Sequence, residues 1–379
     1  MEFRDLKQQY QVIKGNLDKK LSEVMESANF IMGEPVVALE KNLAEYVGRK
    51  YCITCANGTD ALQLVMMAWG IGQGDAVLVP DFTFFSTAEI VASVGATPIF
   101  VDVDENTFNI SANDLEHKIQ KLLREGKLKV KAVISVDLFG LPADYIAVKA
   151  ITDKYQLMLL EDGAQGFGGK IGEKKACSFG DASTTSFFPA KPLGCYGDGG
   201  AIFVDDKEVA QLLQSYRIHG KGKEKYDNIR IGMNSRLDTI QAVVLAEKLK
   251  IFADYELENV NKAARWYNEC IGDLVKTPKV PSGFYSSWAQ YTIQLHTKRE
   301  RDELQRYLKS YDIPSMIYYS KPMHQQKAFM QLKQSDEQCP VSTRLCETVL
   351  SLPMHPYLKK EELTEVADKV NEFMFGCNL

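Results

Sequence analysis

Thr184-Thr-Ser-Phe-Phe-Pro-Ala-Lys191-Pro-Leu-Gly-Cys-Tyr-Gly-Asp-Gly-Gly-Ala201 is the stretch from which the rest of the chain can be interpreted. A β-prone run, residues 182–188, ends in a turn that carries one lysine, and four glycines precede a second strand-like run. We therefore expect Lys191 at the end of a sheet strand, with little side-chain bulk around its amine. A desolvated lysine, or one close to another cation, can act as an imine-forming nucleophile. A surface lysine in a glycine-rich turn would give the same local pattern, so more distant segments must decide.

The composition is that of an ordinary globular protein. Of its 379 residues, 45% are hydrophobic and 25% are charged, and this length suggests about two to three domains. The net charge of −5 gives no reason to expect nucleic acid or an anionic membrane as a partner. We expect a cytoplasmic protein, because no apolar run approaches the roughly 20 residues of a membrane helix and the charged opening is unlike a secretory signal.

The eight cysteines are scattered along the chain, which favours free thiols over a disulfide framework. Cys52-Ile-Thr-Cys55 has the spacing of a redox pair. It lies in a strand-like run, however, where residues three positions apart point to opposite faces. We therefore expect no redox function for this pair, and we assign no metal ligands.

Strands and helices alternate from residue 51 to residue 204, which predicts a mainly parallel sheet covered by helices on both faces. After the first strand, Ala56-Asn-Gly-Thr-Asp60 opens a helix. Such a helix start offers free backbone N–H groups and the positive end of the helix dipole to an anion, and Thr59 can add a hydroxyl. A simple turn before a capped helix explains Asn57-Gly58 equally well.

Other strand ends carry groups suited to a flat, charged ligand. Phe84 follows the strand 76–80, and Asp162 and Gln165 follow the strand 156–160. Ligands of open α/β sheets bind beyond the carboxyl ends of the strands, so these side chains should share one edge with Thr59 and Lys191. An anion site, an aromatic ring, an acid and an amine at one edge form a stronger signal than any of them alone.

The pattern changes in the C-terminal third of the chain. A long helical pattern over residues 239–271 is typical of a connector, and a smaller α+β unit follows from residue 277. We predict a large domain over residues 1–245, including an N-terminal helix, and a connector helix with a small domain over residues 246–379. The polar run 221–230 is either a solvated loop or a segment that binds a diphosphate.

With these residues in place, the chain resembles the sugar-nucleotide aminotransferases of the DegT/DnrJ/EryC/StrS type, a family that uses pyridoxal 5′-phosphate (PLP). The resemblance covers nearly the whole chain and implies the α/β fold of PLP-dependent transferases of fold type I, like that of aspartate aminotransferase. It rests on eight spaced motifs: Gly33-Glu-Pro35, Ala56-Asn-Gly-Thr-Asp60, Phe82-Thr-Phe84, Glu161-Asp-Gly-Ala-Gln165, Ser186-Phe-Phe-Pro-Ala-Lys191, Gly197-Asp-Gly-Gly200, Asn234-Ser-Arg236 and Pro322-Met-His324.

The resemblance implies a role for each residue that matches a family motif. Lys191 matches the lysine that forms a Schiff base with PLP, and Asp162 matches the carboxylate beside the pyridine nitrogen, which it keeps protonated. Gln165 matches the partner of the phenolic oxygen. The remaining cofactor positions are the stacking ring of Phe84 and the phosphate ligands Gly58, Thr59 and Ser186.

Five further positions extend the implied site. Asn234 matches a phosphate ligand that the second subunit donates, which implies a homodimer with shared active sites. Candidates for contact with the nucleotide sugar are Arg236, Tyr318, Tyr319 and His324.

The implied reaction moves an amino group from glutamate, which leaves as 2-oxoglutarate, through the pyridoxamine form of the cofactor to a UDP-linked keto-sugar. Within the family, Ser351-Leu-Pro-Met-His-Pro-Tyr357 favours enzymes that aminate the 3-keto group of a UDP-2-acetamido hexuronic acid in surface glycan biosynthesis. Asp137 and Tyr318 stand where many relatives have histidine. A 4-aminotransferase for a UDP- or dTDP-4-keto-6-deoxy sugar and a non-catalytic PLP-binding regulator stay open as alternatives. A nicotinamide enzyme is disfavoured, because Gly194-Cys-Tyr-Gly-Asp-Gly leads into a strand.

Overall fold

A seven-stranded sheet forms the centre of the computed structural model, which describes residues 1–377 apart from residues 225 and 273. The strand order is β1-β9-β8-β5-β4-β2-β3. Five of the strands make the parallel pairs β3–β2–β4–β5–β8, whereas β9 is antiparallel to both of its neighbours. The strands are β1 (Tyr51–Cys55), β2 (Asp75–Pro80), β3 (Thr97–Val101), β4 (Lys129–Val136), β5 (Met158–Asp162), β8 (Ala182–Ser186) and β9 (Gly200–Val204).

The two reversals around β9 bring β1 back into the direction of β8. The carboxyl ends of β1, β2, β4, β5 and β8 therefore lie at one edge of the sheet. The mainly parallel α/β sheet expected from the sequence is confirmed.

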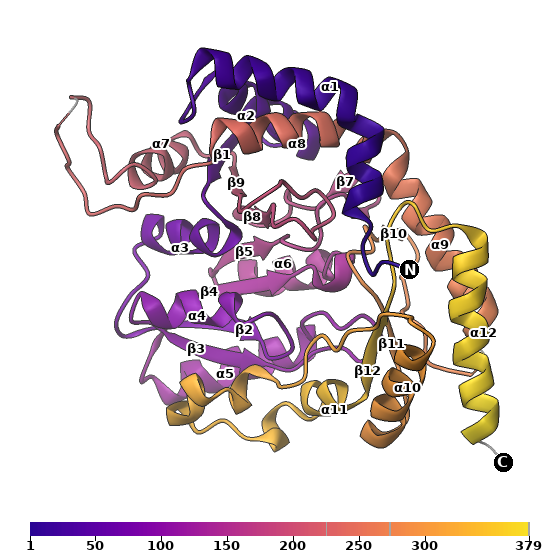
Figure 1. The fold of residues 1–379 in the computed structure, drawn as a ribbon. Coiled ribbons are helices and arrows are strands. Elements are labelled where there is room, and N and C mark those ends of the chain that lie inside the picture. The colour runs from indigo at the N-terminus through magenta and orange to yellow at the C-terminus, as the bar shows by residue number, and fades with distance from the viewer. Residues whose placement is uncertain (225, 273, 378–379) are drawn as a thin grey trace.

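Helices cover both faces of the sheet because neighbouring strand residues alternate between two apolar cores. On β2, Val77 and Val79 belong to a core with α3 (Gly58–Ala68), α4 (Ser86–Ser93) and α7 (Lys207–Tyr216). Leu78 instead belongs to a core with α5 (Ala112–Glu125) and α6 (Tyr145–Lys154). On that second face, α1 (Leu6–Ser27), α2 (Glu34–Val47) and α8 (Thr239–Ile251) cover β1 and β9 (Figure 1).

The predicted connector is a continuous helical segment. α8 runs through a π-helical segment, Phe252–Glu256, into α9 (Leu257–Ile271). The boundary proposed at residue 245 falls within α8, and the division into two domains stays a prediction.

The C-terminal part of the chain builds a core of its own. In it, α9, α10 (Lys298–Ser310) and α12 (Lys360–Cys377) pack on the antiparallel pair β11 (Tyr291–Gln294) and β12 (Val349–Leu352) (Figure 1). The smaller elements are β6 (Lys170–Ile171), β7 (Lys174–Lys175), β10 (Phe284–Tyr285), α11 (Pro340–Thr348) and four short 3₁₀ turns at Leu138–Gly140, Met323–Gln325, Lys327–Leu332 and Asp336–Gln338. Within the described residues, none of the helices combines the length and the apolar character needed to cross a membrane.

Candidate active site

Lys191 lies in the turn that joins β8 to β9, residues 187–199. The turn is closed at its base, because Phe187 N donates to Gly199 O at 2.7 Å and Cys195 N donates to Phe187 O at 2.8 Å. The Lys191 side chain is half-buried. Desolvation of its ammonium group lowers the pKa of Lys191 to about 8, while the Asp162 carboxylate acts in the opposite direction. An amine with this pKa is partly unprotonated near neutral pH, as a nucleophile or a proton carrier must be.

Asp162 is the last residue of β5 and is 4% exposed. Thr87 Oγ1 donates to Asp162 Oδ2 at 3.0 Å, and Ala164 N donates to Oδ1 at 3.2 Å. Burial raises the pKa of Asp162, and these two hydrogen bonds together with Lys191 act in the opposite direction. Within the described part of the chain, no cation forms an ion pair with this carboxylate. It is therefore suited to pair with a cationic nitrogen of a ligand.

The start of α3 forms a cradle for an anion. Asn57 caps this helix by accepting a hydrogen bond from Asp60 N at 2.8 Å, and Thr59 Oγ1 lies 2.9 Å from Ser86 Oγ. Gly58 packs directly on Ser186, since a Cβ atom at position 58 would lie 2.7 Å from Ser186 Cβ. Hydroxyl groups thus lie beside a helix N-terminus, the arrangement that binds phosphate groups in many proteins.

Gln165 connects the sheet edge to the C-terminal part of the chain. Its Oε1 accepts from Phe139 N at 2.7 Å, and its Nε2 donates to the Tyr319 hydroxyl at 3.0 Å. The ring of Phe84 lies 6.2 Å from the ring of Tyr319 and is 53% exposed. An exposed aromatic ring at this edge is available to stack on a flat ligand.

His324 differs from the other predicted site residues because its ring lies between two carboxylates of the same chain. Its ring is 5% exposed, with Nδ1 2.7 Å from Asp81 Oδ2 and Nε2 2.6 Å from Asp336 Oδ1. Both ring nitrogens therefore have carboxylate partners within the chain. Tyr318, which precedes His324 in the C-terminal part of the chain, is half-buried, and its ring meets the ring of Phe3 edge-on.

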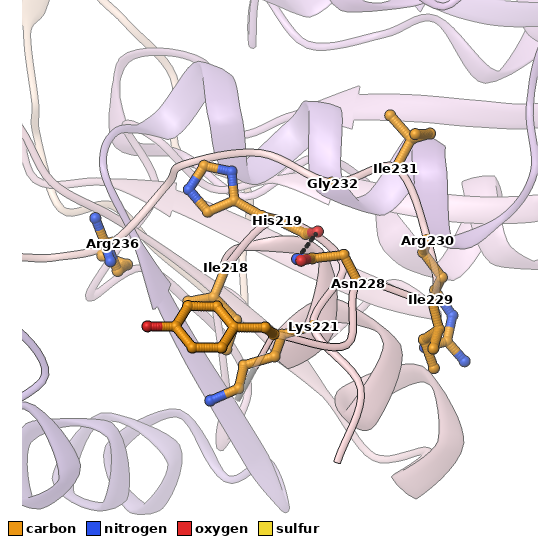
Figure 2. Close-up of a pocket in the computed structure, with 10 residues that line it drawn as sticks. Ile218, His219, Lys221, Asn228, Ile229, Arg230, Ile231, Gly232 and Arg236 are labelled. Carbon is orange, nitrogen blue, oxygen red and sulfur yellow. Dashed lines mark hydrogen bonds between the residues drawn. The ribbon is translucent and has the colours of Figure 1, made fainter. Parts of the chain in front are cut away.

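Asn234 and Arg236 lie beside the loop that follows α7, which projects from the body of the molecule (Figure 1). Asn234 is exposed and forms an antiparallel bridge with Ile218. Arg236 lines an open pocket of about 900 Å³, together with Lys221 and Arg230. In Figure 2, Arg236 and Lys221 border this pocket on one side and Arg230 on the other. The pocket is lined partly by the predicted polar loop 221–230 and partly by the segments on either side of it, which contribute Ile218, His219, Ile231, Gly232 and Arg236. Residue 225 of the loop lies outside the described residues.

Sequence reasoning missed Ser86 and Thr87. Both open α4 directly beyond the end of β2, and their hydroxyl groups contact Thr59 and Asp162 respectively. The signal was present, because β2 and α4 repeat the succession of strand, turn and helix start that singled out Thr59 between β1 and α3.

A family model described as the DegT/DnrJ/EryC1/StrS aminotransferase family matches residues 11–371. The chain belongs to this family. The aminotransferase activity expected from the motifs is thus confirmed, and this protein is an aminotransferase.

Three relatives match nearly the full length of this family member. The UDP-2-acetamido-2-deoxy-3-oxo-D-glucuronate aminotransferase of Pseudomonas aeruginosa is 42% identical over 94% of this chain and 96% of the relative. The pleiotropic regulatory protein of Geobacillus stearothermophilus is 41% identical over 97% of each chain. The UDP-N-acetyl-3-dehydro-alpha-D-glucosamine 3-aminotransferase of Acidithiobacillus ferrooxidans is 38% identical over 98% of this chain and 97% of the relative.

A solved structure confirms the predicted fold type. The crystal structure of a DegT DnrJ EryC1 StrS aminotransferase from Brucella abortus is 48% identical, covers 99% of each chain and has a TM-score of 0.96.

PLP is the cofactor of this family, and the residues at the sheet edge fit it. They supply an amine with a pKa near 8, a buried carboxylate that lacks an ion-pair partner among the described residues, and an anion cradle at α3. Lys191 would hold the aldehyde carbon, Asp162 the ring nitrogen and Gln165 the phenolic oxygen. The ring and the phosphate would contact Phe84, Gly58, Thr59 and Ser186. These individual roles stay predictions.

Proposed function

We propose that this aminotransferase moves the amino group of glutamate to the 3-keto group of a UDP-linked 2-acetamido hexuronic acid, in glycan biosynthesis. The observation that carries the proposal is the half-buried Lys191 amine, with a pKa of about 8, in the field of the buried Asp162 carboxylate. The named substrates of the Pseudomonas and Acidithiobacillus relatives support the choice of sugar, because both are UDP-linked N-acetylated sugars with the keto group at carbon 3. The uronic acid is favoured because the Pseudomonas relative, whose named substrate is a glucuronate, is 42% identical, whereas the Acidithiobacillus relative is 38% identical.

Bound PLP supplies an electron sink that weakens the bond between the α-carbon of the amino acid and its hydrogen. The protein supplies proton transfer and orientation. Lys191 Nζ can accept the proton from the α-carbon and later return one, because a pKa of about 8 keeps both forms populated near neutral pH. Asp162, held by Thr87 and Ala164, presents an anion to the ring nitrogen. Water is consumed when 2-oxoglutarate is released, and the keto oxygen of the sugar leaves as water when the retained amino group takes its place.

The proposal includes a homodimer with shared sites. In support, Asn234 is exposed and forms a bridge with Ile218 at the base of the loop after α7. That loop projects from the body of the molecule (Figure 1). If Asn234 serves a neighbouring site, mixing inactive Lys191→Ala and Asn234→Ala proteins should restore about a quarter of wild-type turnover. Half of the dimers would then be mixed, and each of these would hold one intact site. A mixture that stays inactive contradicts sharing.

We also place the protein in the cytoplasm. In support, the seven cysteines whose side chains the structure describes are free thiols, which suits a reducing compartment.

A non-catalytic PLP-binding regulator is the second candidate, and the regulatory name of the Geobacillus relative favours it. The presence of Lys191, Asp162 and Gln165 at one sheet edge speaks against it, because a regulator would not need a group that transfers protons.

Two measurements test the proposed reaction. Adding glutamate to the PLP-bound protein should change its visible absorbance, and the UDP-3-keto uronic acid should then be aminated. Turnover of only a 4-keto-6-deoxy sugar would overturn the assignment of carbon 3, and bound PLP without any reaction with glutamate would favour the regulator. Borohydride reduction should leave the pyridoxyl group on the Lys191 peptide. Lys191→Ala should abolish the absorbance and turnover, whereas Lys207→Ala, an exposed lysine at the start of α7, should change neither.

A further inference from the structure

Two basic side chains from distant parts of the chain bind the backbone of the Lys191 turn. Arg4 Nη2 donates to Lys191 O at 2.7 Å and to Pro192 O at 3.3 Å, and Lys248 Nζ donates to Gly194 O at 2.7 Å. We propose that Arg4 and Lys248 are positioning residues for Lys191, which fix its turn by the carbonyl oxygens, and that Arg4 also sets the charge around its amine. This inference rests on the proposed role of Lys191.

Arg4 is itself held on both sides. Asp5 caps α1 by accepting a hydrogen bond from Gln8 N at 2.8 Å, and Phe3 O accepts one from Met354 N at 3.3 Å. Arg4 thus lies between the start of α1 and the segment that follows β12. No carboxylate in the described residues forms an ion pair with its guanidinium, so its donors are available to the turn.

Lys248 directs its ammonium group at the same turn. Its side chain, on α8, is 1% exposed, and Nζ lies 4.2 Å from the ring centre of Tyr196 in addition to its bond to Gly194 O. Both contacts are to residues 187–199. A buried lysine is rare unless it is paired, and here its partners are a carbonyl and an aromatic ring of the turn that carries the proposed catalytic amine.

One buried carboxylate acts on both of these basic groups. Glu256, the last residue of the π-helical segment, is 3% exposed, and its Oε1 accepts from Gln9 Nε2 at 2.9 Å and from the Tyr357 hydroxyl. π-helical segments often occur at functional sites. This segment also joins the helix that carries Lys248 to α9, which begins directly after Glu256.

The pKa values of the cluster agree with this arrangement. Burial lowers the pKa of Arg4 to about 10, with Glu256 and Tyr357 acting in the opposite direction. Burial lowers the pKa of Lys248 to about 7, reinforced by Arg4 and opposed by Glu256 and Cys195. At Lys191, Arg4 acts with burial to lower the pKa and Asp162 acts against them. The positive charge of Arg4 therefore favours the neutral form of the Lys191 amine.

Competitive acetylation of the cofactor-free protein tests the proposal without turnover. Trace labelling from about pH 6 to pH 10, with the Lys191 peptide quantified by mass spectrometry, gives the pKa of the amine. We expect a wild-type midpoint near pH 8. Arg4→Gln should move it upward and lower kcat of the PLP-bound enzyme about tenfold or more, with KM for glutamate nearly unchanged, because a charge-assisted hydrogen bond to the turn is lost.

Conservative variants separate positioning from general stability. Arg4→Lys keeps the charge but loses the two-carbonyl contact, so the labelling midpoint should stay near the wild-type value while kcat falls partly. Lys248→Met should lower kcat through the loss of the bond to Gly194 O. Arg344→Gln, which removes an exposed arginine paired with Glu105, should change neither quantity.

A wild-type midpoint and kcat in Arg4→Gln, together with a wild-type kcat in Lys248→Met, would overturn the inference. If Arg4→Gln does not fold, Arg4→Lys and Lys248→Met decide, because kcat should fall in both while KM for glutamate stays nearly unchanged, and a wild-type kcat in both would overturn the inference. Failure of the proposed function is distinguishable, since it appears as a wild-type protein that transfers no amino group to the 3-keto sugar, whereas the midpoints are measured without cofactor or substrate.

Discussion

The side-chain amide of Gln165 donates a hydrogen bond of 3.0 Å to the Tyr319 hydroxyl across 154 positions of sequence. The same amide is fixed at its oxygen by Phe139 N at 2.7 Å. Gln165 therefore has one defined orientation at the sheet edge, and that orientation depends on a tyrosine from the C-terminal part of the chain. Any ligand that uses Gln165 is sensitive to how that part packs on the sheet.

A double-mutant cycle on this pair should show coupling. Gln165→Leu and Tyr319→Phe should each lower kcat about five- to tenfold, because each removes one partner of the bond. The double variant should lose less than the product of the two effects, by about 0.5–1.5 kcal/mol. Steady-state kinetics of the four proteins check this. Independent effects would mean that Tyr319 does not orient Gln165.

Thr87→Val should weaken retention of PLP. Valine has nearly the shape of threonine but cannot donate to Asp162 Oδ2, so the buried carboxylate loses one of its two hydrogen bonds. Loss of a hydrogen bond to a charged group corresponds to about 10- to 100-fold. Equilibrium dialysis of PLP measures the effect, and Asp162→Ala should exceed it.

Thr83→Val is the matched control for that measurement. Thr83 Oγ1 lies 3.1 Å from Thr87 Oγ1, one hydroxyl further from the carboxylate, so its effect should be smaller. Equal retention of PLP by the wild type and Thr87→Val would contradict the role given to Asp162.

Gly58→Ala should lower the affinity for PLP and for inorganic phosphate. The added Cβ atom would lie 2.7 Å from Ser186 Cβ, so the start of α3 or the end of β8 must move. Gly15→Ala is the control, because its Cβ atom would meet nothing within 4 Å inside α1. That substitution should be neutral or stabilise the helix by about 0.5–1 kcal/mol. Calorimetry of phosphate binding distinguishes the two variants. An unchanged phosphate affinity in Gly58→Ala would exclude the start of α3 as the phosphate site.

His324→Ala should lower the free energy of unfolding by about 3–5 kcal/mol, because it leaves the fully buried Asp81 without its cationic partner. Asp336→Ala removes an exposed partner of the same ring and should cost less than about 1 kcal/mol. Denaturant unfolding measures both changes. If His324 instead contacts the nucleotide sugar, His324→Ala would raise KM for that substrate and leave unfolding unchanged.

The effect of His324 should depend on pH. Burial alone would lower the pKa of His324, but the hydrogen bonds and charges of Asp81 and Asp336 raise it overall. The folded state therefore holds this proton more tightly than the unfolded state. Its contribution to stability is complete below about pH 6.5, the pKa in the unfolded chain, and is lost as the pH rises through the folded pKa. The difference in free energy of unfolding between wild type and His324→Ala should therefore shrink as the pH rises above about 6.5 and through the folded-state pKa of His324.

The sequence predicts those parts of the site that follow a strand directly. Asp162 ends β5, and Thr59, Gln165 and Lys191 each follow a strand by a few residues. Because parallel strands end at the same edge, local patterns suffice to collect them. The direction of β9 could not be predicted this way, because a glycine-rich turn can lead to either orientation. The π-helical segment escaped as well, because the sequence shows only one continuous helical pattern over residues 239–271.

Contacts between distant residues were beyond local reasoning. Arg4 reaches Lys191 across 187 positions, and His324 reaches Asp81 across 243 positions. Nothing near Arg4 distinguishes it from other charged residues at the start of a helix. A histidine in a Pro-Met-His motif suggested a ligand contact, whereas the folded chain surrounds it with two carboxylates.

The turn that carries Lys191 is anchored at both ends by the pairing of β8 with β9, and its base is closed between Phe187 and Gly199. One inserted or deleted residue between these points would shift the amine relative to Asp162 and could not be absorbed by sliding either strand. The loop after α7 is also paired at its base, where Ile218 bridges Asn234 and His219 N donates to Met233 O at 2.8 Å. It projects from the body of the molecule (Figure 1), however, and residues 221–230 include none of the residues that we assign to the cofactor. As such proteins diverge, we expect length changes to collect in that loop and to be excluded from the turn.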